Sequence, residues 1–251
     1  MLSAYRAWAL EQNDRRLVFA TGDGMTLFGE SGGARVTCHD HPAWKVVLPV
    51  AGPAWIGDVA AAGLIVPPQL AHTCATESGY VALFIDPWLL PSGLGLVRLA
   101  ADTVRRLHAA LGADGAGRHD LTAAFRELIA FTGPASALDT RVAHALRQAV
   151  HAEHGATVQA IAADVGLSAS RLRTLVRESA GVPLARLRRW GRLRNAIAGL
   201  PGGNVATAAA AAGFADQSHL TRTARSLLGR TPLSLTSASA VTAPRGARHG
   251  R

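Results

Sequence analysis

Two histidines and the single lysine of the chain stand at odd-numbered positions in the stretch GARVTCHDHPAWKVVLPVAG. Side chains alternate between the two faces of a strand, so we expect His39, His41 and Lys45 on one face. Neutral imidazoles can bind a metal ion or accept hydrogen bonds, whereas a protonated lysine only donates them and repels a cation. These residues predict a polar site in the N-terminal half, suited either to a metal or to an anion.

A second group of polar residues lies on the outward faces of two short amphipathic segments near the C-terminus, LSASRLRTLVRESAG and GFADQSHLTRTARSLLGRTP. Apolar side chains recur at helical spacing on one side of each segment. The opposite sides carry donors and cations: Ser170, Arg171, Arg173, Thr174 and Arg177 in the first, and Gln217, Ser218, His219, Thr221, Arg222 and Arg225 in the second. Such side chains bind phosphates and base edges, so the pattern predicts two helices that read DNA.

Each of these segments follows another short helical pattern and a glycine. TVQAIAADVG leads to the first segment and NVATAAAAAG to the second, and their final glycines are 47 residues apart. Helix, glycine turn and helix with a polar outer face is the helix-turn-helix arrangement. The stretch between the units, LARLRRWGRLRNAIAGL, has its own helical period and would be about 25 Å long at about 1.5 Å per residue. A rigid helix of this length could hold two reading helices about 34 Å apart, one turn of DNA.

The charge of the chain is distributed unevenly along it. Residues 1–140 hold 10 Lys+Arg and 13 Asp+Glu, whereas residues 141–251 hold 16 and 4, a balance of +12. This asymmetry indicates that the C-terminal half meets a polyanion. Hydrophobic residues make up 49% of the chain, which is enough to bury sizeable cores.

The composition divides the chain into five parts. Residues 1–95 combine recurrent turn glycines with short runs rich in β-branched and aromatic residues, which predict a small β-barrel or sandwich. Residues 96–132 have the helical period, with apolar faces that suit a dimer partner, and residues 133–140 read as a linker. Residues 141–237 are expected to be all helical and residues 238–251 to be a disordered basic tail. The predicted fold class is therefore α+β.

The C-terminal half resembles the DNA-binding domain of the AraC/XylS family of bacterial transcription regulators. The resemblance covers residues from about 143 to 236 and is carried by Ile161-Ala162, Leu172, Gly181, Arg192-Leu193, Gly213-Phe214, Ser218, Leu220, Thr221, Arg222, Gly229 and Thr231-Pro232. It implies base contacts by Ser170, Arg173 and Thr174 in the first unit and by Gln217, Ser218, His219 and Arg222 in the second.

The N-terminal half resembles a cupin, in line with the sensor domains common in that family. The spacing from Gly33 through His39 and His41 to Gly52 is similar to the first cupin motif, and VPPQLAH is similar to the second through Pro67 and His72. Metal cupins carry a glutamate where this chain has Lys45. Three interpretations stay open: hydrogen-bonded structural histidines; an effector pocket formed by His39, His41, Lys45 and His72, with Lys45 as counter-charge; or a metal site that could include Cys74 or Cys38.

The sequence thus predicts a one-component transcription regulator that binds double-stranded DNA and a small-molecule effector. We expect it to be a homodimer, to need no cofactor, to have no membrane span and no catalytic residues, and to contact RNA polymerase if it activates transcription. Two cysteines without an export signal favour the cytoplasm. The alternative is a metal-responsive regulator, or a metal-dependent cupin enzyme with a DNA-binding appendage.

The inferred reading face of the second unit can be tested with two neighbouring arginines. Arg222→Ala is expected to weaken binding to the operator far more than binding to a scrambled duplex, by about 1–3 kcal/mol, because Arg222 is placed at base edges. Arg225→Ala, one position off that face, should weaken both about equally. Titrations of each variant on the two duplexes measure the difference, and full operator discrimination by the Arg222 variant would remove the assignment.

Overall fold

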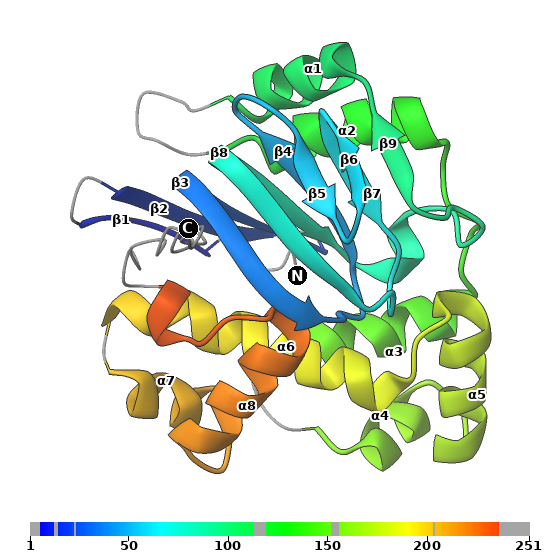
Figure 1. The fold of residues 1–251 in the computed structure, drawn as a ribbon. Helices are drawn as coiled ribbons and strands as arrows, with labels where there is room; N and C mark the ends of the chain where they lie inside the picture. The colour runs from blue at the N-terminus through cyan, green and yellow to red at the C-terminus, as the bar shows by residue number, and fades with distance from the viewer. Residues whose placement is uncertain are drawn as a thin grey trace, which may run out of the picture.

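The computed structural model describes residues 6–12, 15–22, 24–112, 119–151, 156–202 and 204–235, so the predicted tail at 238–251 lies outside the described residues. Within them a strand-rich part precedes a helical part (Figure 1). The strands are β1 (Arg6–Gln12), β2 (Arg15–Gly22), β3 (Met25–His39), β4 (Trp44–Pro49), β5 (Ala54–Ile56), β6 (Val59–Ala61), β7 (Gly63–Val66), β8 (His72–Ile85) and β9 (Val97–Leu99). The prediction of an α+β chain with an N-terminal β domain is confirmed.

All described strands join one antiparallel sheet in the order β1-β2-β3-β8-β4-β7-β9, and β5 pairs with β6 and β8. The long strands β3 and β8 form its centre. Their register places Glu30 opposite Tyr80 and His39 opposite His72, with an irregularity just before His39. On the other edge of β8, Lys45 of β4 lies opposite Phe84. Pairing of distant strands therefore brings together side chains far apart in sequence.

Two helices, α1 (Ala101–Leu111) and α2 (Leu121–Thr132), cover one face of the sheet (Figure 1). The expectation that the helical segment begins at residue 96 is wrong, because Val97–Leu99 pair with β7 as strand β9 and α1 begins only at Ala101. The apolar faces that were expected to meet a dimer partner are instead buried within the chain, where Leu107 and Leu128 share a core with Trp44. Helical period reveals an apolar face but not what covers it, and here the sheet covers it.

The remaining described helices form the C-terminal part: α3 (Thr140–His151), α4 (Val158–Asp164), α5 (Ala169–Ala180), α6 (Leu184–Ala198), α7 (Val205–Ala211) and α8 (Gln217–Leu228). Units α4–α5 and α7–α8 each turn at a glycine with positive φ, Gly166 and Gly213. The side chains of Ser168 and Asp216 accept hydrogen bonds from backbone N–H groups in the first turns of α5 and α8. No described helix is long and apolar enough to cross a bilayer.

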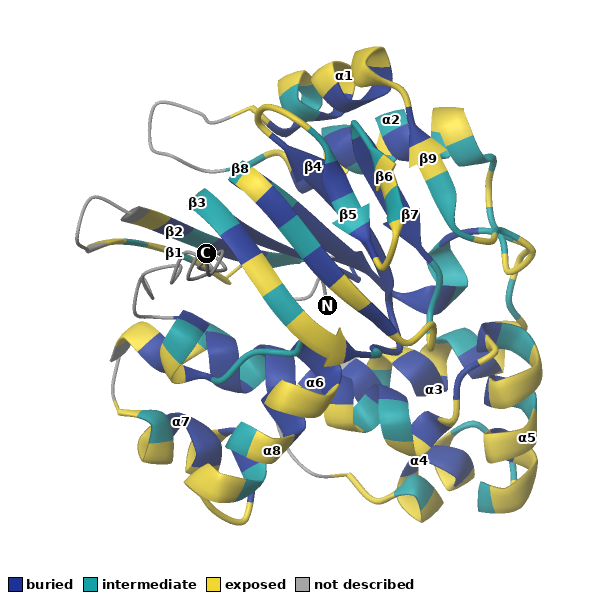
Figure 2. Cartoon of the chain, in the orientation of Figure 1, coloured by how far each residue is buried: buried dark blue, intermediate teal, exposed yellow. Residues whose placement is uncertain are grey.

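The helical part packs directly against the sheet. One hydrophobic core joins Phe19, Phe28 and Phe84 of the sheet to Trp190 of α6 and Leu227 of α8. The indole N–H of Trp8 donates to the Ile197 carbonyl (3.2 Å), and the Arg194 guanidinium pairs with the buried carboxylate of Asp86 (3.1 Å). Figure 2 shows that the outer surfaces of α5 and α8, away from this junction, are largely exposed.

The end of α8 makes the tightest backbone contact at this junction. Gly229 ends α8 in the left-handed conformation, and the Thr37 hydroxyl of β3 donates to its carbonyl (3.0 Å). A Cβ built on Gly229 would lie 2.5 Å from the Thr37 carbonyl oxygen and 2.8 Å from His39 Nδ1. Only glycine at this position allows the second helix-turn-helix unit, α7–α8, to approach the sheet this closely.

A pair of glycine substitutions tests the contact, because Gly181 ends α5 in the same conformation with no atom within 4 Å of its Cβ position. Gly181→Ala is expected to lower the free energy of unfolding by about 1 kcal/mol through backbone strain alone. Gly229→Ala should cost about 1–3 kcal/mol more, because the new methyl group overlaps β3. Equal unfolding midpoints for the two variants in chemical denaturation would show that this approach does not exist in solution.

Candidate functional site

The side chains predicted to read DNA lie on the outer surfaces of α5 and α8. Of the eleven named above, Thr221 is half-buried and nine are exposed: Ser170, Arg171, Arg173, Thr174, Arg177, Gln217, Ser218, Arg222 and Arg225. His219 differs, because its ring is half-buried and packs edge-on against Phe214 at 5.2 Å between centroids. Leu172 and Leu220 on the opposite faces are fully buried, so the amphipathic pattern is oriented as predicted. Base contacts by these residues stay a prediction.

A further cationic group lies on the connecting helix α6, between the two units. Arg188 donates to the Ala156 carbonyl next to α4 (2.7 Å), and Arg192 donates to the Gly213 carbonyl in the turn before α8 (3.1 Å). Burial and the charges of Arg188 and Arg189 lower the pKa of Arg192. Among the described residues no carboxylate pairs with these three arginines. The sequence interpretation read this helix only as a spacer, although its run of arginines was visible.

In the strand-rich part, the structure brings all four predicted pocket residues together. One ring nitrogen from each of His39, His41 and His72 lies within 4.8 Å of the others, and all three side chains are buried. The Lys45 Nζ lies 3.4 Å from His39 Nε2 and 3.5 Å from His72 Nε2. We call these four residues the histidine–lysine cluster.

The cluster differs from its prediction in how it is assembled. His39, His41 and Lys45 were expected on one face of a single strand, but β3 ends at His39, β4 begins at Trp44, and His41 lies in the connection between them. The three residues converge because the chain reverses there, and His72 joins them because it pairs with His39 across β3 and β8. Strand alternation therefore predicted the correct set of residues. Their convergence has a different cause, which is the chain reversal between β3 and β4 and the pairing of β3 with β8.

The environment of the cluster keeps its imidazoles neutral. Burial, reinforced by the charge of Lys45, lowers the pKa of His39 to about 3 and that of His72 to about 4. The same two causes hold the pKa of His41 well below its usual value. The lone pairs of these rings are therefore available to a donor or a cation near neutral pH.

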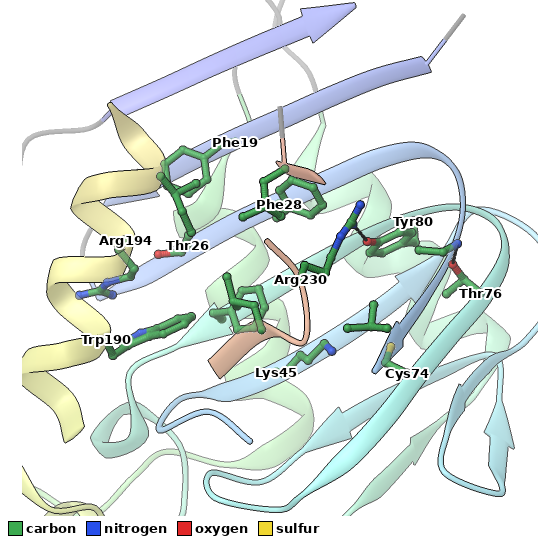
Figure 3. Close-up of a pocket in the computed structure, with 17 residues that line it drawn as sticks. Phe19, Thr26, Phe28, Lys45, Cys74, Thr76, Tyr80, Trp190, Arg194 and Arg230 are labelled. Atoms are coloured by element: carbon green, nitrogen blue, oxygen red, sulfur yellow. Dashed lines mark hydrogen bonds between the residues drawn. The ribbon is translucent and has the colours of Figure 1, made fainter. Parts of the chain in front are cut away.

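A cavity lies next to the cluster, between the sheet and the helical part (Figure 3). It offers about 50 Å³ to the centres of water-sized molecules, several times the roughly 10–15 Å³ that one water needs. Its wall is mainly apolar and includes Phe19, Phe28, Phe84, Trp190, Ile197, Leu228 and Leu235. Lys45 lines the cavity, but the three histidines do not. The predicted pocket inside the β domain is thus corrected: both halves of the chain form its wall.

A buried polar network that the sequence interpretation missed crosses the same cavity. Arg230, just after α8, donates to the Glu30 carboxylate (2.8 Å) and to the Tyr80 hydroxyl (3.1 Å), and its guanidinium lies over the Phe28 ring. Burial disfavours the charge of Arg230, but Tyr80 and Glu30 raise its pKa above the usual value. Burial also raises the pKa of Tyr80. Only the acid within the strand-like run LFGESGG could have signalled a buried partner.

Comparison with known proteins agrees with this arrangement. A family model described as a helix-turn-helix domain matches residues 161–237, which include α5, both turns and α8. The chain carries an AraC-type helix-turn-helix domain. This domain contains all the residues assigned to DNA reading, and the predictions of an AraC-type domain at the C-terminus and of the fold class are confirmed. A search of curated proteins finds no match.

Solved structures extend the similarity beyond the AraC-type domain to the strand-rich part. ToxT from Vibrio cholerae superposes with a TM-score of 0.55 at 13% identity, covering 84% of this chain and 97% of ToxT. ToxT from Vibrio cholerae O395 gives a TM-score of 0.53 at 12% identity, covering 84% and 96%. Wild-type ToxT with a bound unsaturated fatty acid gives 0.51 at 13%, covering 84% and 94%. At these identities the similarity establishes the fold.

The buried pair Glu30–Arg230 generates a double-mutant prediction. Glu30→Gln or Arg230→Gln alone should lower the free energy of unfolding by about 3–5 kcal/mol, because each leaves the partner charge buried. The loss of unfolding free energy in the double variant should be smaller, by about 1–3 kcal/mol, than the sum of the losses in the two single variants. Urea denaturation measures this coupling, with the exposed pair Asp102–Arg105 as a control expected to couple weakly. Additive losses at Glu30 and Arg230 would contradict the pairing.

Proposed function

We propose that the protein is a sequence-specific DNA-binding transcription regulator whose sensor part binds a small molecule with an apolar chain and a carboxylate. One observation carries the effector class: Lys45 enters the wall of an apolar cavity and has no carboxylate partner among the described residues. The other two cations in that wall, Arg194 and Arg230, already pair with Asp86 and Glu30.

Charge balance in the cavity favours an anion. Neutral histidines accept hydrogen bonds from Lys45 but do not compensate its charge, and a buried charge without a counter-ion is costly. A carboxylate within reach of the ammonium would supply that compensation, while an alkyl or alkenyl chain would occupy the apolar part of the cavity. The fatty acid bound to ToxT, which shares the fold, supports this chemical class.

The position of the cavity supports a mechanism of response. Its wall includes Lys45 and Phe84 of the sheet together with Trp190 of α6 and Arg230 just beyond α8. A ligand there contacts both the sensor and the helices that carry the reading units. It would change DNA binding if it prefers one arrangement of the two parts, because coupling requires different affinities for the two states.

On the DNA side, we assign base reading to the exposed faces of α5 and α8. We add Arg188 and Arg192 as phosphate contacts between the units, because both are cationic, lack a described acidic partner and reach the edges of both units. A homodimer in the cytoplasm, with RNA polymerase as a partner if the protein activates transcription, stays our prediction. The Phe131 side chain, 42% exposed at the end of α2, offers an apolar contact for a second copy.

The effector assignment is tested with a long-chain unsaturated fatty acid and its alcohol as an uncharged analogue. The acid should raise the unfolding midpoint of the wild-type protein and change its affinity for operator DNA, and the alcohol should do so weakly. Lys45→Met should weaken binding of the acid about 10–100-fold, the loss of a charge-assisted hydrogen bond of about 1.5–3 kcal/mol.

Lys45→Arg is the matched control, because it keeps a cation at the same position. It should retain most of the preference for acid over alcohol. If Lys45→Met binds the acid as tightly as the wild type, Lys45 does not recognise the carboxylate. If neither compound shifts the midpoint, the effector belongs to another chemical class.

A further inference from the structure

The two reading helices end in the same way, and the strand-rich part contacts both ends. Helices α5 and α8 have 12 residues each and end at Gly181 and Gly229, which both adopt the left-handed conformation. The carbonyl oxygen of each glycine accepts a hydrogen bond from a side chain of the strand-rich part. Gln69 Nε2 donates to Gly181 (2.8 Å), and the Thr37 hydroxyl donates to Gly229 (3.0 Å). Equivalent atoms of the two units are therefore held by the same part of the chain.

We propose that Thr37 and Gln69 are positioning residues for DNA reading. Together they fix the separation and tilt of α5 and α8, and thereby the spacing between the two DNA segments that one chain recognises. We call these two contacts the helix-end clamp. The inference rests on the proposed DNA-binding function and adds two residues outside the helical part that determine which operators are accepted.

The backbone of Gln69 is strained, which points to a role for its side chain. Its φ is +64°, and among the described residues it is the only one other than glycine with a positive φ. Such strain persists where the surrounding contacts fix a residue, often at functional positions. Glycine at this position would remove the strain but also the amide that reaches Gly181. The chain therefore keeps a strained residue whose side chain contacts the end of α5.

The backbone joins the two arms of the clamp. The N–H of Gln69 donates to the His41 carbonyl (2.8 Å), which ties the segment before β8 to the connection between β3 and β4. In that connection, the N–H of Asp40 donates to the Ser226 carbonyl of α8 (3.3 Å), and the Asp40 carboxylate pairs with Arg186 of α6 (2.6 Å). The segments around Thr37 and Gln69 therefore form one platform that contacts α5, α6 and α8.

The clamp leaves the predicted reading surfaces open to DNA. Recognition helices contact base edges mainly through their N-terminal residues. Ser170 and Arg173 near the start of α5 are exposed, as are Gln217 and Ser218 at the start of α8, whereas the clamp holds the opposite ends of both helices. The contacts with the strand-rich part therefore favour positioning of the helices over blocking of their DNA-binding faces.

A fixed separation matters because DNA presents its major groove periodically. Two reading helices about 34 Å apart meet the same face of the duplex one helical turn apart. One inserted base pair moves the second segment by about 3.4 Å and rotates it by about one tenth of a turn. The connector α6 sets the distance between the units, and contacts at the ends of α5 and α8 limit their tilt. A clamped protein should therefore reject the inserted base pair.

The test uses a duplex that the full-length wild type selects from a random pool, and a copy with one base pair inserted between the two enriched blocks. The insertion should weaken wild-type binding at least about 30-fold, because one unit then loses its base contacts. Thr37→Val and Gln69→Gly should each reduce this penalty about 2–10-fold, the range for one hydrogen bond, and the double variant should reduce it further. Thr37→Ser keeps the hydroxyl and should retain the wild-type penalty.

Chemical denaturation separates positioning from a merely structural role. Gln69→Gly relieves the backbone strain, so its unfolding midpoint should stay close to that of the wild type while its spacing preference falls. The penalty is a ratio of two affinities measured on one preparation, so a partly unfolded variant leaves it unchanged.

The outcomes distinguish the clamp from the proposed function. An unchanged penalty in the double variant overturns the clamp alone, and so does a wild type that binds both duplexes equally. A variant that binds the selected duplex more tightly than the wild type also overturns it, because the contacts would then be inhibitory. A wild type that enriches no duplex overturns sequence-specific DNA binding itself, and the clamp with it.

Discussion

The packing of α6 against the sheet is the constraint on which the rest of the structure depends. This helix connects the two reading units, and its Trp190 and Ile197 lie in the same core as Phe19 and Phe84 of the sheet. The apolar side of the connector is therefore buried on two sides, against the other helices of the C-terminal part and against the sheet. A rigid connector fixed in this way holds both units in one orientation toward the sheet. Any ligand that separates α6 from the sheet would move both units together.

Burying this junction forces its charged groups into pairs. Arg194 and Arg230 come from the helical part, and Asp86 and Glu30 from the sheet supply their counter-charges. Lys45 is different, because its described partners are neutral imidazoles. Lys45 lines the wall of the cavity, and the effector proposal concerns its uncompensated charge.

The reading units were predictable because they are local. Period, turn glycines and capping residues lie within about 25 residues of each other, and each unit must bury its own apolar face. For the histidine–lysine cluster, the sequence predicted which residues take part but not how they are arranged. Its geometry depends on the pairing of β3 with β8 and on a chain reversal at His41, and neither follows from residue alternation. For α1 and α2, the sequence revealed the apolar faces but not that the sheet would cover them.

By itself the sequence determined the fold class, the two helix-turn-helix units, the polar residues of their outer faces and the cationic character of the C-terminal half. These are properties of short segments and of composition. Only the tertiary structure decided that Glu30, Tyr80 and Arg230 form one buried network, that the cavity lies between the two halves, and that His39, His41 and His72 lie close together. These features join residues up to 200 positions apart, and their contacts arise when strand register and domain packing bring distant segments together.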